Sequence, residues 1–293
     1  MPEVVDFDSF ALLMWQLRHF ISTLLMSIVL LLSSSCAKQN YINAGKVNRP
    51  VASIEDLDWD LEVGRPVYES FLHHSKDEGF AVDVAEDKRL VGRLNHIMKK
   101  LQSYSQIPNL PFQVHLVDSP EANAACFPGG EIVFFKGIFD LKEKGFIDPK
   151  SDDEITAVMS HEMSHAVLRH SYRSKKTSDK TFIAAILGSI AAGQLGGEAV
   201  QTIFQVAFDV STGLFFPKYS RGHESEADLE GVIMMYKSGF EPEAAVKIWQ
   251  RAMARGGYNA TTTDIFAGHP SDKTRAQTLA RVIALMRSMG IQE

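Results

Sequence analysis

The first regular pattern of hydrophobic and polar residues runs from about Gly64 to about Ser105. Its apolar positions lie three or four residues apart, which places them on one face of a helix. These positions are Leu90, Leu94, Ile97, Met98 and Leu101. The pattern predicts helical structure with one buried side. Residues 37–62 are polar and aperiodic by comparison, so we expect a linker there.

Two later stretches have patterns typical of β-strands. FQVHLVD (112–118) alternates between apolar and polar residues, and EIVFFKGIFD (131–140) is rich in β-formers before it runs into a turn or helix. The intervening NAACFPGG ends in Pro-Gly-Gly, a strong turn signal. We therefore expect a small sheet whose strands pair antiparallel.

A further pattern predicts a helix that begins near Ser151. Ser151 is a suitable N-cap, Glu154 stands where its side chain can reach back to the cap, and the acidic first turn suits the helix dipole. Apolar residues continue the helical period from Ile155 to Val167. The stretch SHEMSHAVLRH (160–170) therefore begins inside a helix and not in a loop.

Residues 181–216 are apolar and rich in glycine. Three structures fit them: a buried helical hairpin, an element on a membrane surface, or a membrane-spanning segment. Their longest run of apolar or small residues covers only twelve positions, 182–193, whereas a spanning helix needs about 20. A packed hairpin or mobile lid is therefore favoured. Three more helices are predicted at 223–240, 242–257 and 272–289.

Composition narrows the class of protein. The chain has 293 residues, of which 45% are hydrophobic and 23% charged, as in ordinary globular domains. The net charge is −6 and no run of Lys or Arg is interleaved with aromatic residues, so nothing indicates binding to nucleic acid. The two cysteines, Cys36 and Cys126, are too few for a scaffold stapled by disulfides.

The N-terminal segment has the residue order of a secretory signal. Arg18 and His19 precede an apolar stretch (20–32), after which small residues lead to Cys36. The sequence Ser-Ser-Ser-Cys at 33–36 resembles the lipobox of bacterial lipoproteins, in which the cysteine carries lipid. A lipidated anchor, a cleaved signal and an uncleaved membrane anchor remain alternatives, and each places the rest of the chain outside the cytoplasm.

The expected organisation has three segments and one folded domain. The segments are a leader (1–36), a linker (37–62) and a domain (63–293). The domain is predicted to be α+β and mostly helical, with a small antiparallel sheet beside the helix that carries the histidines.

His161 and His165 are the first candidates for chemistry. Residues four apart share one face of a helix, so both imidazoles can point at one metal ion. Glu162 lies beside the first histidine, where a carboxylate can reach a metal-bound water. A solvated polar helix face is the alternative explanation of this motif taken alone.

The predicted helix at 223–240 supplies the third ligand that a catalytic zinc site needs. Glu224 and Asp228 lie four apart and share a face, whereas Glu226 points elsewhere. Glu224 is the candidate ligand, and Asp228 is the candidate acceptor for the second N–H of a ligand histidine. Two such motifs on two well-formed helices favour a metal site over two solvated faces.

These motifs resemble those of a known family. HEMSHAVLRH (161–170) and YSRGHESEAD (219–228) are similar to the metal motifs of gluzincin metallopeptidases of the CAAX prenyl endopeptidase family, above all its small bacterial lipoprotein branch. The stretches EVGRPVYESF, NAACFPGGEIVFFKGIFD and GHPSDKTRAQTL also resemble that family, so the similarity covers roughly residues 62–290. Arg169 and His170 match its Arg-His pair, and we expect them to hold helices together.

The resemblance implies a zincin-like fold, one bound zinc ion and zinc-assisted hydrolysis of peptide bonds. Glu162 would be the general base. His269 is implicated either as a donor to the oxyanion or as a ligand that closes the resting site. Arg221 and His223 are other candidate donors near the site.

The strand at 131–135 is the candidate element for substrate binding. Metallopeptidases commonly hold substrate as a strand added to a sheet edge, where backbone bonding tolerates many sequences. The residues expected to shape that edge are Asn123, Ala124, Gly129 and Gly130. Such an edge suits unfolded or misassembled protein substrates.

Two classes of function follow from these expectations. The first is a zinc endopeptidase for protein quality control in the bacterial envelope, bound to a membrane by the N-terminal lipid; Ala37 after the cysteine favours the outer membrane. The second is an envelope chaperone or assembly factor with a closed zinc site. An integral-membrane prenyl-protein protease is disfavoured because several spans of about 20 apolar residues are missing from the sequence.

Overall fold

The computed structural model describes residues 57–143, 145–175, 219–254 and 273–288. The chain divides into two compact units at residue 50, and every described residue belongs to the second unit. The candidate signal, Cys36, the apolar segment 181–216 and His269 lie outside the described residues. Along the described chain, the elements are α2 (Asp58–Asp77), η2 (Ala85–Asp87), α3 (Lys88–Gln102), β1 (Gln113–Val117), β2 (Ala124–Cys126), β3 (Glu131–Phe135), η3 (Lys136–Phe139), α4 (Asp152–Val167), α5 (His170–Lys175), α8 (Arg221–Lys237), α9 (Glu243–Ala254) and α11 (Lys273–Ser288).

The sheet has three strands in the order β1-β3-β2. β1 and β3 pair in parallel, with Gln113 opposite Glu131, so the antiparallel pairing expected for these two stretches is wrong. The reason is a short strand inside their connection. β2 reverses the chain first and pairs antiparallel with β3, which then enters between its two neighbours. The sequence of β2, Ala-Ala-Cys, is buried throughout and gives no alternating signal.

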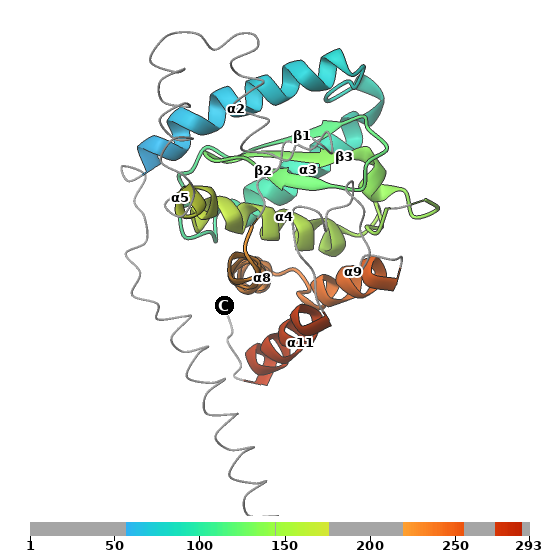
Figure 1. Cartoon of the computed structure of the whole chain (residues 1–293). Coiled ribbons are helices and arrows are strands. Elements are labelled where there is room, and N and C mark those ends of the chain that lie inside the picture. The colour runs from blue at the N-terminus through green and yellow to red at the C-terminus, as the bar shows by residue number, and fades with distance from the viewer. Residues whose placement is uncertain (1–56, 144, 176–218, 255–272, 289–293) are drawn as a thin grey trace, which may run out of the picture. The chain divides into compact units, whose positions relative to one another are not determined.

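The two faces of the sheet are covered by helices from different parts of the sequence (Figure 1). α2 covers one face, where Tyr68 and Phe71 pack with Val117, Val133 and Phe135 in one buried cluster. α3 and α4 lie against the other face. Because a buried aromatic side chain contributes about 1.5–3 kcal/mol, this cluster fixes α2 firmly on the sheet.

α2 approaches the sheet closely because Gly64 has no side chain. A Cβ atom at Gly64 would lie 1.5 Å from the carbonyl oxygen of Pro128, in the turn that precedes β3. The buried carboxylate of Asp60 also ties the helix to the rest of the domain, since it accepts a hydrogen bond of 2.8 Å from Arg169. α2 begins at Asp58, so the end of the range 37–62, expected to be a linker, belongs to the folded unit.

α4 is the central helix of the domain. Its residues from Glu154 to Val167 are all buried, because the sheet, α3, α8 and α9 surround it. Ser151 caps it as expected, with its hydroxyl accepting from the Glu154 N–H. The Glu154 carboxylate does not reach back to the cap; it accepts from the Asp148 N–H at 2.8 Å and pairs with Arg251 of α9.

The three C-terminal helices occur where the pattern predicted them. α8 packs against α4 on the side away from the sheet (Figure 1), and Gly231 is the point of close approach. A Cβ atom there would lie 3.2 Å from the backbone nitrogen of His161. This contact brings the start of α8 to the histidines of α4.

Together these elements confirm the expected α+β, mostly helical, zincin-like class, with a mixed sheet in place of an antiparallel one. Within the part of the chain that the structure describes, no helix combines the length and apolar character needed to cross a membrane.

Candidate metal centre

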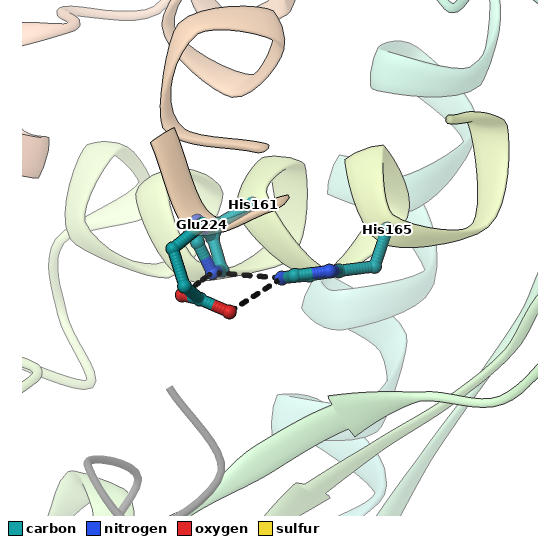
Figure 2. A group of neighbouring side chains, drawn as sticks. All are labelled: His161, His165 and Glu224. Atoms are coloured by element: carbon teal, nitrogen blue, oxygen red, sulfur yellow. Dashed lines mark hydrogen bonds and ion pairs between the residues drawn. The ribbon is translucent and has the colours of Figure 1, made fainter. Parts of the chain in front are cut away.

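His161 and His165 project from successive turns of α4 toward Glu224 on α8 (Figure 2). The two Nε2 atoms are 3.1 Å apart, and the Glu224 carboxylate oxygens lie 3.4 Å from His161 Nε2 and 3.5 Å from His165 Nε2. One donor atom from each residue fits within a group no more than 4.8 Å across. All three side chains are buried.

This set of donors fits a metal ion. Two imidazole nitrogens and one carboxylate form a catalytic type of zinc site, in which three protein ligands leave a fourth position for water. The shared-face geometry expected for the two histidines and the convergence with Glu224 are both present.

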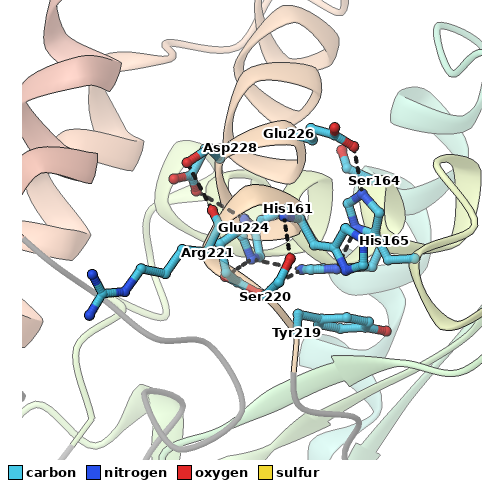
Figure 3. A network of polar contacts seen from close by, with 12 residues as sticks. His161, Ser164, His165, Tyr219, Ser220, Arg221, Glu224, Glu226 and Asp228 are labelled. Carbon is cyan, nitrogen blue, oxygen red and sulfur yellow. Dashed lines mark hydrogen bonds and ion pairs between the residues drawn. The ribbon is translucent and has the colours of Figure 1, made fainter. Parts of the chain in front are cut away.

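The far nitrogen of His161 is held by Asp228. Its Nδ1 atom lies 3.1 Å from Asp228 Oδ1 (Figure 3). Arg275 of α11 donates two hydrogen bonds to the Asp228 carboxylate, one of 2.7 Å from Nε and one of 2.8 Å from Nη2. A third nitrogen of the same guanidinium lies 3.0 Å from Glu224. One arginine therefore holds both carboxylates of α8 in place.

The charges around His161 favour a cation at this point. Burial lowers the pKa of His161, but hydrogen bonds to Asp228 and Glu224 outweigh it and raise the pKa to about 10. Burial raises the pKa of Asp228, but the charges and hydrogen bonds of Arg275 and His161 together outweigh burial and lower that pKa.

A second set of residues surrounds His165. Tyr219 stacks on its ring with centroids 3.8 Å apart, and His170 Nδ1 lies 2.8 Å from His165 Nδ1. His170 Nε2 in turn lies 3.3 Å from Glu226, which is also paired with Arg173. Burial lowers the pKa of His170 to about 4, despite the opposing hydrogen bond to Glu226.

Arg169 and His170 connect helices, as the sequence suggested. Arg169 pairs with Asp60 of α2 and lies over the ring of Tyr172, 4.0 Å from its centroid. His170 connects α4 with Glu226 of α8. Glu226 does point away from the cluster of His161, His165 and Glu224, as predicted.

Glu162 is buried and directly follows the first histidine of the group. Its charge adds to the effect of burial in raising the pKa of both Cys126 and Tyr219. The carboxylate therefore lies close to β2 and to the residues before α8. Its proposed role as a base remains a prediction at this point.

The residues expected to shape a substrate edge fall into two groups. Asn123 and Ala124 lie at β2, where the Asn123 side chain accepts a hydrogen bond of 2.9 Å from the Ala124 N–H. Gly129 and Gly130 adopt positive φ angles of 85° and 104° in the turn before β3. Gly129 packs against the backbone of α2, where its Cβ would lie 3.0 Å from Asp60 O.

β3 does not offer an edge, because β1 and β2 occupy its two sides. The expectation that residues 131–135 hold substrate at an edge is therefore wrong. The edge strand beside α4 is β2, and no strand of the described residues pairs with its outer side. Asn123 and Phe127 bond to β3, so in this antiparallel pair the backbone of Ala124 and Cys126 faces outward.

Several residues around the candidate metal group were not predicted from the sequence. Arg275 and Tyr219 come from distant segments. Of the two candidate donors that the sequence did suggest, Arg221 is exposed and points away from the ligands (Figure 3), and His223 stacks on His170 with ring centroids 4.5 Å apart. Arg275 lies inside the stretch that carries the C-terminal resemblance, which was the signal available for it.

The fold and these side chains define an HExxH-type metallopeptidase domain. The model of Peptidase family M48 matches residues 88–283, so the chain belongs to this family, whose metallopeptidases use a metal cofactor. The match includes α3, the sheet, and the helices that carry all the residues of the candidate centre.

Curated relatives include proteases from mitochondria and bacteria. The chain is 29% identical over 187 residues to the mitochondrial metalloendopeptidase OMA1 of Schizosaccharomyces pombe, covering 64% of this chain and 51% of the relative. It is 25% identical over 211 residues to the beta-barrel assembly-enhancing protease of Escherichia coli, covering 70% of this chain and 41% of the relative. The chain thus spans about half the length of the curated relatives it matches.

Proposed function

We propose that the chain is a zinc-dependent endopeptidase. The observation that carries this proposal is the buried convergence of His161, His165 and Glu224, with Glu162 beside the first ligand. A site that only stabilised the fold would have no use for a base at that position. Membership of family M48 and the names of its relatives support the same activity.

One zinc ion per chain would be held by the three converging side chains. When bound, zinc polarises the scissile carbonyl and lowers the pKa of a coordinated water toward neutrality. Asp228 fixes the orientation of His161, and Arg275 holds the carboxylates of Asp228 and Glu224 in position by contacting both. The chain itself thus prepares the ligand geometry before substrate arrives.

Glu162 acts as the general base and then as the general acid. Its carboxylate takes a proton from the attacking water and returns it to the nitrogen of the leaving amine. The water oxygen first bonds to the carbonyl carbon, and the tetrahedral oxyanion then collapses with cleavage of the carbon–nitrogen bond, so the products are a carboxylate and an amine. We assign to His269 either stabilisation of the oxyanion or closure of the resting site, as the resemblance implies.

The edge strand β2 suits an extended protein substrate. The Ala124 carbonyl and the Cys126 N–H point away from β3, where they can pair with a passing backbone. Because backbone pairing is tolerant of sequence, this edge fits unfolded or misassembled proteins better than one fixed recognition sequence. The Escherichia coli relative, named for enhancing β-barrel assembly, supports a role in protein quality control.

We assign the protein to the bacterial cell envelope. Residues 1–36 would be a leader whose cysteine carries lipid, and the anchor would hold the domain at a membrane, the outer membrane being favoured. On the same basis we propose that the chain belongs to the small lipoprotein branch related to CAAX prenyl endopeptidases. A chaperone or assembly factor with a closed, weakly active zinc site is the alternative function.

Metal analysis with a proteolysis assay tests the proposal. Purified residues 37–293 should contain about one zinc per chain, cleave casein, and lose that cleavage with a chelator. His165→Ala should lose most of the metal. Full zinc occupancy in His165→Ala would contradict the ligand assignment, and chelator-resistant cleavage would contradict the metal-dependent reaction.

A further inference from the structure

The two ligand histidines are held by partners of different kinds. His161 meets a carboxylate directly, at 3.1 Å from Nδ1 to Asp228. His165 meets another imidazole, at 2.8 Å from Nδ1 to Nδ1 of His170. The next contact outward is again a carboxylate, since His170 Nε2 lies 3.3 Å from Glu226. Each branch ends at an arginine, Arg275 in one case and Arg173 in the other.

The positions of the protons follow from these contacts. The Nε2 atoms of both ligand histidines face Glu224, so a metal-binding His165 carries its proton on Nδ1. Two ring nitrogens 2.8 Å apart make a hydrogen bond only when one donates and the other accepts. His170 Nδ1 is therefore the acceptor, and the proton of His170 is on Nε2.

Glu226 explains why His170 adopts that tautomer. An ionised carboxylate only accepts hydrogen bonds, so it favours a proton on the nitrogen that faces it. Arg173 compensates the charge of Glu226 through both carboxylate oxygens. Figure 3 shows Asp228 and Glu226 on opposite sides of α8.

We propose that His170 and Glu226 are positioning residues that hold His165 as its Nδ1–H tautomer, with its Nε2 lone pair directed at the metal. The proposal rests on the proposed function, because it assigns these residues a role in holding the same metal ion. Neither residue touches the reacting atoms. Their effect passes through His165 alone.

The local backbone supports this assignment. Arg169, directly before His170, has a φ of 54°, in the left-handed region that non-glycine residues rarely adopt. This turn joins α4 to α5, and it is held by the ion pair of Arg169 with Asp60. His170 is thereby returned, fully buried, to the side of His165. Its ring is also stacked on His223.

If His170 had only a structural role, replacing it would lower the stability of the domain and leave its affinity for zinc unchanged. Zinc affinity therefore distinguishes a structural role from the proposed positioning of His165. His170→Phe keeps an aromatic ring but cannot accept the proton of His165. In the full chain, we expect zinc to bind about 10–100-fold more weakly, measured by competition with a chromophoric chelator. His170→Gln should restore most of the affinity, because its amide can accept from His165 and donate to Glu226.

His115→Phe is the matched control. His115 is a partly buried histidine that also contacts carboxylates, with Nδ1 2.8 Å from Asp83, but it belongs to β1 and does not contact the metal group. The His115→Phe variant should be less stable than the wild type but should bind zinc with the same affinity. A folded His170→Phe protein with wild-type zinc affinity would overturn the positioning role of His170 and Glu226 while leaving the proposed function intact. A wild-type chain that takes up no zinc would overturn both.

The tautomer of His170 can be measured directly, and it tests the proposed positioning role even if His170→Phe does not fold. Long-range ¹H–¹⁵N spectra of the zinc-loaded chain should show His170 as a neutral imidazole with its proton on Nε2. Glu226→Leu removes the acceptor and should reduce that preference. A His170 ring protonated on Nδ1 in the wild-type protein would refute the proposal.

Discussion

Replacing His115 with glutamine should make the stability of the domain depend less on pH. His115 lies on the α2 side of the sheet, beneath the ring of Tyr68. Its Nδ1 atom contacts Asp83 at 2.8 Å and its Nε2 atom lies 3.5 Å from Glu131. Protonated His115 therefore joins the loop before η2 to two neighbouring strands.

The size of the effect follows from the pKa of His115. Burial lowers this pKa, but the contacts of the imidazole with the carboxylates of Asp83 and Glu131 together outweigh burial and raise it from 6.5 to about 9. At about 1.4 kcal/mol per pH unit, this corresponds to about 3 kcal/mol. The imidazole keeps 21% of its exposure, so solvent screening makes this an upper value.

The sign of the pH dependence is set by the raised value. A group whose pKa is higher in the folded state stabilises that state fully below its unfolded pKa. For His115 the contribution is complete below 6.5 and is lost as the pH rises through about 9. Glutamine does not titrate, so the His115→Gln variant should not lose this contribution to stability as the pH rises.

Urea unfolding of the metal-free wild type and His115→Gln at several pH values measures the difference. The wild type should exceed the variant in unfolding free energy by about 2–3 kcal/mol near pH 6, and the excess should shrink toward zero near pH 10. Comparing the two proteins cancels titrations elsewhere in the chain. An excess that is equal at both pH values would show that the contacts of His115 do not depend on its charge.

Other expected outcomes concern the metal site and the leader. Asp228→Asn should reduce zinc affinity or activity about 10–100-fold, because the amide presents donors to Arg275; an unchanged chelator competition curve would argue against its orienting role. Gly231→Val should push α8 away from α4, because a Cβ at this position would already lie 3.2 Å from His161 N. The variant should therefore bind zinc more weakly in the same assay; wild-type affinity would show that the two helices can adjust to the larger side chain. Cys36 should carry lipid, which mass spectrometry of the membrane fraction detects; an unmodified cysteine still joined to Ser35 would exclude the lipoprotein anchor.

The candidate metal group was predictable because its information is local. His161 and His165 share a helix face by spacing alone, and α4 is signalled by its cap and its acidic first turn. The same spacing placed Asp228 one turn from Glu224, and the structure brings it to the far nitrogen of His161. Periodicity fixes which side chains point together on one helix.

The sheet and the outer contacts were not predictable in the same way. β2 has three residues and is buried on every position, so no alternation distinguishes it from a loop. The parallel pairing of β1 with β3 depends on this strand, and one residue pattern cannot show which strands become neighbours. Arg275, Tyr219 and Glu226 reach the histidines only through the packing of α8 and α11 on α4.

The comparison of Glu162→Gln with the wild type tests the central claim most directly. Glutamine is nearly isosteric and Glu162 is not among the three converging ligands, so the variant should hold zinc as the wild type does. It should cleave an unfolded protein at least about 10²–10⁴-fold more slowly, because an amide cannot take the proton of the attacking water. Both rates are measured at known zinc content. A variant that retains zinc and cleaves at near the wild-type rate would contradict the peptidase mechanism.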